Sequence, residues 1–290
     1  MSGRPRVALT CDLEESHHGL GVAAAASRLV HDVDWILEQL SGLGVTATFF
    51  VVGELADTHP AVVKRIAAQG HEIAYHGATH CFLADEGPER FQAGIAHYVP
   101  LIEDLAGSAV RGFRAPYFSL CATTAWCLEV LARRGFRYDA SIYPAFNDRY
   151  GWLGAPTRPS VHAPTGMLLF PVPLLHRRLP IAFSGGAYLR ILPWRLLEWG
   201  MRGRAAQGDP GMIYFHPWEI STALPWRWDA PVRANLTRHL FRGRMRARLT
   251  TLLAAVVEDL GPMSDVLDAL PPLPVWDPRA DGAARGQYSS

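Results

Sequence analysis

Two histidines, His76 and His80, stand four residues apart and have the spacing of a metal-binding pair. If this segment is helical, both side chains lie on one helix face with Cβ atoms about 5–6 Å apart, and both imidazoles can reach the same cation. The chain contains 12 histidines, so a pair with a purely structural role is the alternative. The spacing alone therefore suggests a metal site without establishing one.

Two acidic residues, Asp12 and Glu14, stand at the end of the first predicted strand. Alternation along an extended chain places both carboxylates on the same side. A catalytic zinc ion takes three protein ligands and leaves one position open, and two histidines with one carboxylate are a common ligand set. One acid could therefore bind a metal together with His76 and His80, while the other acts as a base. Because Glu15 follows directly, a solvated acidic turn is the alternative.

Three further polar residues also follow predicted strands. Arg114 could hold a catalytic carboxylate by charge-assisted hydrogen bonds. His216, with Trp218 close behind it, is suited to donate a proton beside a sugar ring. Asp139 could orient that histidine and raise its pKa. Taken one at a time, each of these residues has a plain alternative as a turn or core residue.

Segments typical of strands and helices alternate along the first half of the chain. The predicted strands cover residues 7–11, 46–52, 72–75 and 110–113, and another begins at 138. The predicted helices cover residues 31–40, 59–69, 88–105 and 123–134. This alternation predicts βα units and a parallel sheet or barrel. In such folds the chemistry lies at the carboxyl ends of the strands, so we expect the polar residues named above to converge on one mouth.

The second half of the chain has a weaker pattern. Residues 151–211 are rich in proline and glycine, which predicts long loops. Residues 212–215 predict a late strand directly before His216, and residues 237–260 predict a helix whose first half is rich in arginine. Residues 271–290 are rich in proline and then small and polar, which predicts a flexible tail.

Composition excludes several classes of protein. The chain has 290 residues, with 28 Lys and Arg against 27 Asp and Glu, and a net charge of +1 argues against a nucleic-acid binder. Hydrophobic residues make up 49% and charged residues 19%, which is typical of a globular protein. Four cysteines exclude a disulfide scaffold. We find no transmembrane segment and no signal peptide, and therefore expect a cytoplasmic protein.

The order of these residues resembles one known family. Asp12, His76-x-x-x-His80, Arg114-x-Pro-Tyr, Asp139 and His216 occur in the order found in the polysaccharide deacetylases (carbohydrate esterase family four), whose type members remove acetyl groups from N-acetylglucosamine units. The resemblance covers residues 5–270. Segments such as RYDASIYPAFNDRYG, GGAYLRILPW and YFHPWEI are similar to the branch associated with bacterial exopolysaccharide and exosortase gene clusters.

The resemblance implies an α/β fold, a distorted (β/α) barrel with about seven strands. It also implies one catalytic domain over residues 1–270, with the tail at 271–290. Asp12 would be the base and Glu14 the metal ligand, although the family usually has two adjacent aspartates there. His76 and His80 match the histidine ligands.

The resemblance assigns roles to the remaining site residues as well. Arg114 matches the residue that holds the base, and the backbone N–H near Tyr117 matches the oxyanion donor. Asp139 and His216 match an orienting pair whose histidine protonates the leaving amine. The residues expected to contact the sugar are Tyr117, Trp218, Gly185 and Gly186.

The implied function is a metal-dependent hydrolase that removes N-acetyl groups from an acetamido sugar in a bacterial cell-surface polysaccharide or its precursor. Zn²⁺ is the expected metal, with Co²⁺, Mn²⁺ or Fe²⁺ as alternatives, because such ligand sets accept several metals. The alternative functions are an O-acetyl esterase, a deformylase or another amidohydrolase on the same fold, and an inactive glycan-binding module. The segment 189–204, with Trp194 and Trp199 among arginines, could rest on a membrane surface if the substrate is lipid-linked; an ordinary core helix is the alternative.

Overall fold

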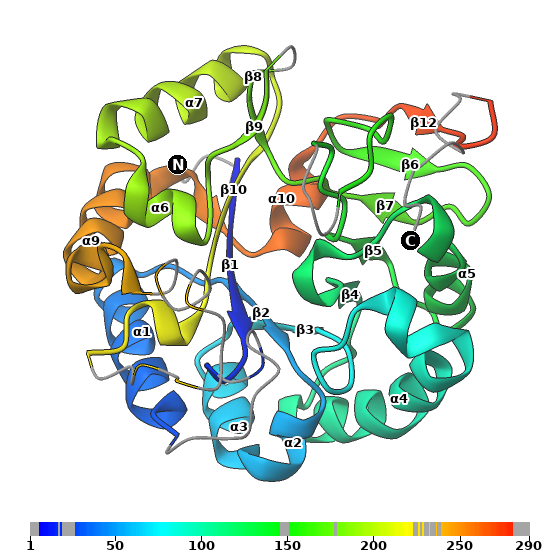
Figure 1. Ribbon diagram of the computed structural model, residues 1–290, viewed down its shortest axis with the longest axis horizontal. Helices are drawn as coiled ribbons and strands as arrows, with labels where there is room; N and C mark the ends of the chain where they lie inside the picture. Colours follow the sequence, from blue (N-terminus) through cyan, green and yellow to red (C-terminus); the bar gives the residue numbers. More distant parts are fainter. Residues whose placement is uncertain are drawn as a thin grey trace.

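A curved ten-stranded sheet forms the centre of the protein. The computed structural model describes residues 6–16, 18, 27–145, 151–176, 179–222, 226, 228, 232, 236 and 239–280. Seven strands of the sheet lie parallel in one row, in the order β10 (Gly211–Phe215), β1 (Val7–Leu13), β2 (Thr48–Val51), β3 (Glu72–Tyr75), β4 (Gly112–Phe113), β5 (Tyr138–Asp139) and β7 (Leu168–Leu169). Figure 1 shows these strands curving around the middle of the molecule, with most helices along the outside.

Short strands extend this row. β6 (Ser160–His162) pairs antiparallel with β7, β12 (Val275–Trp276) pairs with β6, and β11 (Leu260–Gly261) pairs with β1. β8 (Leu174–His176) and β9 (Leu179–Ala182) form a separate hairpin. Among the described residues, β10 and β12 at the two ends of the row do not pair with each other, so the barrel is open. The expected α/β fold with a distorted barrel is confirmed.

The helices of the first half follow the predicted order. They are α1 (Leu29–Leu43), α2 (Glu54–Thr58), α3 (Pro60–Ala68), α4 (Leu83–Ala106) and α5 (Trp126–Arg133). α4 begins earlier than predicted and is interrupted at Gly87, whose φ is 71°. The second half adds α6 (Ala187–Ile191), α7 (Trp194–Ala206), α9 (Met245–Ala255) and α10 (Met263–Ala269).

Strand alternation divides the core into two parts. In β1, Leu9 and Cys11 belong to the outer core between sheet and helices, whereas Ala8 belongs to a smaller core inside the barrel. Because side chains alternate along a strand, Thr10 and Asp12 also face the inside of the barrel. Asp12 is thereby placed at the carboxyl end of β1, on the inner side.

Helix α10 closes the opposite end of the barrel. Its residues Met263, Val266 and Leu267 belong to the inner core. The Met263 backbone N–H donates to Thr48 Oγ1 at 2.7 Å, and Thr48 is the first residue of β2. With the amino ends of the strands covered, the carboxyl ends are left for a site.

Two predictions for the second half are wrong. The helix expected over residues 237–260 is shorter: α9 ends at Ala255, and a 3₁₀ turn (Val257–Asp259) and β11 follow, while residues 237 and 238 lie outside the described residues. The predicted start of the flexible tail, residue 271, is too early in the chain. Trp276 in β12 is buried, and the centroid of its ring lies 5.2 Å from that of Trp152. Residues 281–290 of that tail lie outside the described residues.

No helix in the described part of the chain combines the length and apolar character needed to cross a membrane.

Candidate active site

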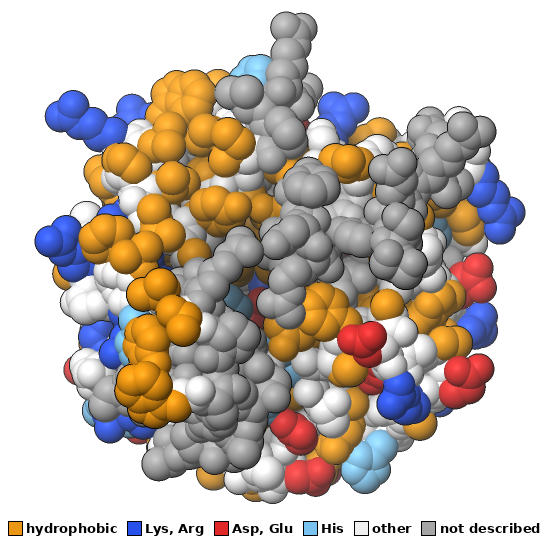
Figure 2. Space-filling view, viewed as in Figure 1, with side chains coloured by type: hydrophobic (Ala, Val, Ile, Leu, Met, Phe, Trp, Pro, Cys, Tyr) orange, Lys and Arg blue, Asp and Glu red, His pale blue; other side chains and the backbone are white. Residues whose placement is uncertain are grey.

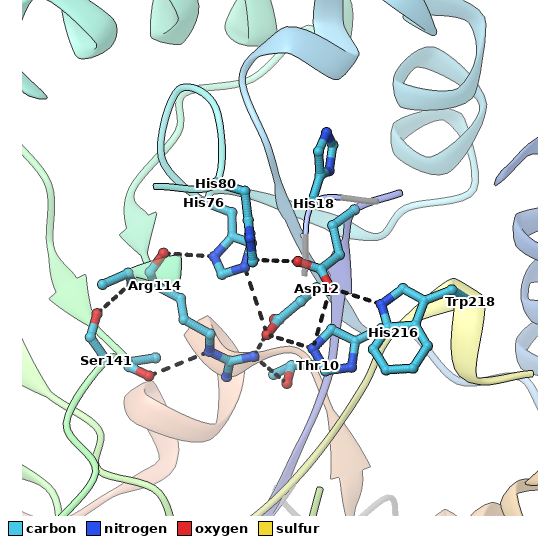
Figure 3. Close-up of polar contacts among 12 residues, drawn as sticks. Thr10, Asp12, His18, His76, His80, Arg114, Ser141, His216 and Trp218 are labelled. Atoms are coloured by element: carbon cyan, nitrogen blue, oxygen red, sulfur yellow. Dashed lines mark hydrogen bonds and ion pairs between the residues drawn. The ribbon is translucent and has the colours of Figure 1, made fainter. Parts of the chain in front are cut away.

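His76 follows β3 and lies in the mouth at the carboxyl ends of the strands (Figure 3). Its Nδ1 lies 2.7 Å from the backbone carbonyl oxygen of Arg114. Because a carbonyl only accepts hydrogen bonds, Nδ1 carries the hydrogen and the Nε2 lone pair faces the site. Burial lowers the pKa of His76 to about 4, against the opposing effect of Asp12. The ring is therefore neutral at neutral pH, as a metal ligand must be.

A loop, and not the expected helix, brings His80 to His76. Gly77 has a φ of 77° and His80 a φ of 57°, so the chain reverses within four residues. The two ring centroids lie 5.1 Å apart. A left-handed backbone at a residue with a side chain costs about 1–2 kcal/mol, and such strain is concentrated at functional sites.

Glu14 completes a cluster of three with these histidines. Ligand atoms of Glu14, His76 and His80 all lie within 4.8 Å of one another, and all three residues are buried. Glu14 Oε2 contacts His80 Nε2, and Glu14 Oε1 accepts a hydrogen bond from Trp218 Nε1 at 2.8 Å. Burial alone would raise the pKa of Glu14, but the neighbouring His80 and His216 imidazoles hold it well below its usual range.

The donor atoms of this cluster fit a divalent cation. Glu14 Oε2 is buried and contacts His80 Nε2 without hydrogen-bond geometry, and the buried His80 Nδ1 has no hydrogen-bond partner among the described residues. Two imidazoles and one carboxylate form the mixed set that zinc and neighbouring transition metals accept, and a three-ligand set leaves a position open for water or substrate.

Asp12 lies beside the cluster and is held by Arg114. Arg114 Nη1 is 2.5 Å from Asp12 Oδ1 and also donates to Thr10 Oγ1 at 3.0 Å. The guanidinium is fully buried, with its carbon 4.1 Å from the centroid of the Phe50 ring. The other carboxylate oxygen, Oδ2, lies 3.9 Å from His76 Nε2. One oxygen of Asp12 is thus fixed and the other faces the site.

His216 approaches Asp12 from the neighbouring strand, because β10 pairs with β1. Its Nε2 lies 3.8 Å from Asp12 Oδ2 and 3.9 Å from Glu14 Oε1. The imidazole stacks on the Trp218 ring with centroids 5.1 Å apart. Burial alone would lower the pKa of His216, but Glu14 and a hydrogen bond with Glu219 raise it to about 9.

The pairing expected between Asp139 and His216 is wrong. Asp139 accepts hydrogen bonds from the backbone N–H of Ser141 at 2.9 Å and from its Oγ at 2.5 Å. Four strands separate β5, which carries Asp139, from β10 in the sheet order β10-β1-β2-β3-β4-β5. Burial raises the pKa of Asp139 to about 7. Ser141 Oγ in turn accepts from the Ala115 N–H at 2.7 Å, so Asp139 supports the segment after Arg114.

The acid that contacts His216 is Glu219, which the sequence analysis did not single out. Glu219 Oε2 lies 2.9 Å from His216 Nδ1 and accepts from the His216 backbone N–H at 3.1 Å. The signal available was a spacing of three residues, which is typical of a capping box. Arg190 was also missed, and its Nε lies 3.0 Å from Glu219 Oε1.

Tyr117 borders the cluster on the side of His80. It lies in a 3₁₀ turn (Pro116–Phe118) with a φ of 57°. Its ring packs edge-on against that of His80, with centroids 4.5 Å apart, and its hydroxyl donates to the backbone oxygen of His18 at 2.7 Å. The role of its backbone N–H as an oxyanion donor stays a prediction.

Gly185 and Gly186 lie behind the site, against Tyr214. A Cβ atom at Gly185 would come within 1.9 Å of the Tyr214 ring, and the Gly186 N–H donates to the Tyr214 backbone oxygen at 3.1 Å. Both glycines are buried. Packing therefore explains the missing side chain at Gly185, while contact of either glycine or of Trp218 with a sugar stays a prediction.

Comparison with known proteins agrees with this geometry. Residues 6–138, which contain the three clustered residues and Asp12, match the family model described as polysaccharide deacetylase. Residues 6–138 belong to the polysaccharide deacetylase family. Residues 140–266 match a different model, a domain of unknown function (DUF3473).

The curated deacetylase relatives match about a third of the chain's length or less. A peptidoglycan deacetylase-like protein, FGM2 of Gibberella zeae, is 34% identical over 101 residues, which are 35% of this chain and 29% of that protein. The peptidoglycan-N-acetylglucosamine deacetylase of Bacillus cereus is 39% identical over 82 residues, 28% of this chain and 30% of that enzyme. The match thus spans less than a third of either relative.

The fold of the deacetylase family extends over nearly the whole chain. A crystal structure of a Mycobacterium smegmatis protein described as a polysaccharide deacetylase superposes with a TM-score of 0.60. The superposition covers 94% of each chain at 19% sequence identity. At this identity the likeness establishes the fold alone.

Proposed function

We propose that the protein is a metal-dependent hydrolase that removes N-acetyl groups from an acetamido sugar in a bacterial cell-surface polysaccharide or its precursor. One observation carries the proposal: Glu14, His76 and His80 cluster within 4.8 Å on one side of Asp12, and His216 Nε2 lies 3.8 Å from the free oxygen of Asp12. A ligand set, a fixed carboxylate and an imidazole thereby share one buried mouth.

The cluster of three would hold a divalent cation. When bound, such a cation polarises an amide carbonyl and lowers the pKa of a bound water from its bulk value to about 7. Asp12 acts as the general base: Arg114 fixes Oδ1, and Oδ2 faces the site and accepts the proton of the attacking water.

His216 acts as the general acid. An amine is a poor leaving group unless its nitrogen is protonated as the C–N bond breaks, and His216 Nε2 supplies that proton. The backbone N–H of Tyr117 donates to the oxyanion that develops on the acetyl carbonyl. Water adds to the acetyl carbon, and the products are acetate and a free amino sugar.

The proposed substrate is an N-acetylated sugar polymer or its precursor. Support comes from the relative of Bacillus cereus, whose name specifies peptidoglycan N-acetylglucosamine. The half-buried Trp218 beside His216 offers an aromatic surface at the place where a leaving amino sugar would lie.

Acetate release from matched substrates tests the function. The chelator-treated protein is loaded separately with Zn²⁺, Co²⁺, Mn²⁺ or Fe²⁺ and given N-acetylated and O-acetylated oligosaccharides of the same backbone. We expect acetate from the N-acetylated sugars only, dependent on added metal. Release from the O-acetylated sugars alone would make the protein an esterase. Glycan binding without release under any metal would make it a binding module.

We also propose that one apolar face rests on an anionic lipid surface, which suits a lipid-linked substrate. Figure 2 shows hydrophobic side chains gathered over α6 and α7, with Lys and Arg at the outer edge. Ile191 and Trp199 are 43% and 53% exposed. Leu240, which is 44% exposed, lies beside α6, because Arg190 Nη1 donates to its backbone oxygen at 3.2 Å. Glu198 is the one acidic residue of α7, and it pairs with an arginine four residues on.

Sedimentation with vesicles tests this contact. We expect binding to vesicles of anionic phosphatidylglycerol, loss of binding at high salt and weaker binding by Trp199→Ser. Leu153→Ser is the matched control, because Leu153 is similarly exposed, at 58%, and belongs to the segment between β5 and β6 instead of α6 or α7. Equal binding by both variants, or no binding to anionic vesicles, would contradict the proposal.

A further inference from the structure

A buried ion pair lies on the side of His216 that faces away from Asp12. Glu219 is fully buried and Arg190 is 2% exposed. Arg190 Nε lies 3.0 Å from Glu219 Oε1, and the other oxygen, Oε2, lies 2.9 Å from His216 Nδ1. Arg190, Glu219 and His216 therefore form a chain of contacts that ends in the mouth.

This chain decides which nitrogen of His216 faces the site. A carboxylate paired with a guanidinium is ionised and only accepts hydrogen bonds, so His216 Nδ1 must carry a hydrogen. The other ring nitrogen, Nε2, is then the one that faces Asp12 Oδ2 and Glu14 Oε1, at 3.8 and 3.9 Å. The His216 backbone N–H also donates to Glu219 Oε2 at 3.1 Å. One carboxylate oxygen therefore holds both the backbone and the imidazole ring of His216.

Arg190 joins three segments that are distant in sequence. It belongs to α6, it pairs with Glu219 in the turn after β10, and its Nη1 donates to the Leu240 backbone oxygen at 3.2 Å. The guanidinium carbon lies 5.8 Å from the centroid of the Trp218 ring, which stacks on His216. An arginine with this many fixed neighbours leaves Glu219 little freedom to turn.

We infer that Glu219 is the positioning residue that sets the orientation and tautomer of His216, and that Arg190 fixes Glu219 for this task. The inference rests on the proposed role of His216 as proton donor. The family resemblance gives the task to Asp139, but Asp139 is bonded to Ser141 and supports the segment after Arg114 instead.

Two substrates that differ in their leaving group test the inference. An N-acetyl sugar needs a proton on its leaving amine, whereas 4-nitrophenyl acetate releases a stable phenolate without one. For Glu219→Gln we expect kcat on the sugar to fall about 10²–10⁴-fold with KM unchanged, and the rate on 4-nitrophenyl acetate to stay within about threefold of the wild type. Glu219→Asp should recover part of the rate, and Arg190→Lys should lie between the wild type and Glu219→Gln. Glu129→Gln makes the same chemical change on an exposed helix and serves as the control.

The outcomes separate the inference from the proposed function. An equal loss on both substrates would make Glu219 a residue of stability only, and a normal rate on the sugar would remove it from the reaction. Both results would overturn the inference. A wild type that hydrolyses the ester and never the acetamide would instead contradict the proposed function.

A spectroscopic measurement on the metal-free protein gives an answer independent of activity. Two-bond ¹⁵N correlations, recorded at a pH above the raised pKa of His216 (about 9) so that its ring is neutral, report which ring nitrogen carries hydrogen, and His216→Gln identifies the signals. We expect hydrogen on Nδ1 in the wild type and a shift toward Nε2 in Glu219→Gln, because a glutamine amide can donate to Nδ1. The same tautomer in both proteins would overturn the inference.

Discussion

Asp12 and Glu14 stand two positions apart at the end of β1, yet their carboxylates have separate partners. Asp12 is held by Arg114 at 2.5 Å, whereas Glu14 contacts His80 and accepts from Trp218 at 2.8 Å. The ligand atoms that cluster within 4.8 Å include Glu14 and leave Asp12 outside. We therefore expect the two amide variants to lose different properties, one its activity and the other its affinity for metal.

Asp12→Asn should keep its metal and lose nearly all activity, because an amide fills the same space but cannot accept the proton of water. Glu14→Gln should bind metal more weakly, because a neutral oxygen replaces a charged one, and excess metal should restore part of its activity. Metal titration and acetate release on both variants check these outcomes. Metal loss in Asp12→Asn together with normal behaviour of Glu14→Gln would reverse the two roles.

Arg114→Met should destabilise the metal-free protein by about 3–5 kcal/mol, because it leaves the carboxylate of Asp12 buried without its counterion. Methionine retains apolar contact with the Phe50 ring, which lies 4.1 Å from the guanidinium carbon. Urea unfolding measures the change. In the double variant Asp12→Asn/Arg114→Met the uncompensated charge is absent, so much of the stability should return. Strictly additive losses would mean that packing, and not charge, explains the effect.

Gly185→Ala should lower stability by about 1–3 kcal/mol, because its new methyl group would overlap the Tyr214 ring and force a shift in a packed core. The matched control is Gly42→Ala on α1, where nothing lies within 4 Å of the added Cβ. There the loss of backbone freedom in the unfolded chain should stabilise the protein by about 0.5–1 kcal/mol. Thermal unfolding distinguishes the expected loss of stability from the expected gain. If Gly185→Ala were as stable as the wild type, the Tyr214 ring would have to move aside at no cost.

His71 should make stability depend on pH below about 6.5. Burial lowers the pKa of His71 from 6.5 to about 4. Between these values the unfolded chain binds a proton that the folded protein does not, so the stabilisation present at high pH is lost as the pH falls.

His71→Asn removes this titration while its side-chain oxygen can still accept the Ala47 N–H that His71 Nδ1 now accepts at 3.2 Å. Urea unfolding of both metal-free proteins from pH 7.5 to 4.5 measures the difference. As the pH is lowered, the free energy of unfolding of the variant should rise relative to that of the wild type. Parallel curves would mean that His71 is protonated as readily in the folded protein as in the unfolded chain.

Local patterns predicted the elements and part of the site. Asp12 lies at the carboxyl end of β1, and His76 and Arg114 directly follow β3 and β4. Parallel strands bring such residues to one edge whatever the intervening loops do. The pairing of His216 was mispredicted, because the choice between Asp139 and Glu219 depends on which strands are neighbours in the sheet. Arg190 had no local signal, since its partner lies 29 residues further along the chain.

The approach of His76 and His80 was predicted through the wrong geometry. A spacing of four residues favours a helix, but Gly77 and His80 adopt positive φ and form a loop. The contacts around the loop hold His80 in this conformation, and the residue type alone does not reveal it. Trp276 was misassigned for a similar reason: a proline-rich segment looks like a tail until its tryptophan is seen packed against Trp152.

The position of β1 between β2 and β10 affects how the chain folds during its synthesis on the ribosome. Thr10 donates to the backbone oxygen of Ile213, 203 positions further along the chain. At about 5–20 residues per second, a ribosome needs roughly 10–40 s to make that partner after β1 emerges. During this interval β2 can pair with one edge of β1, while the other edge is an unpaired apolar strand of the kind that templates aggregation. Yield in a foreign host should therefore depend on chaperones that cover the nascent chain until β10 has been synthesised.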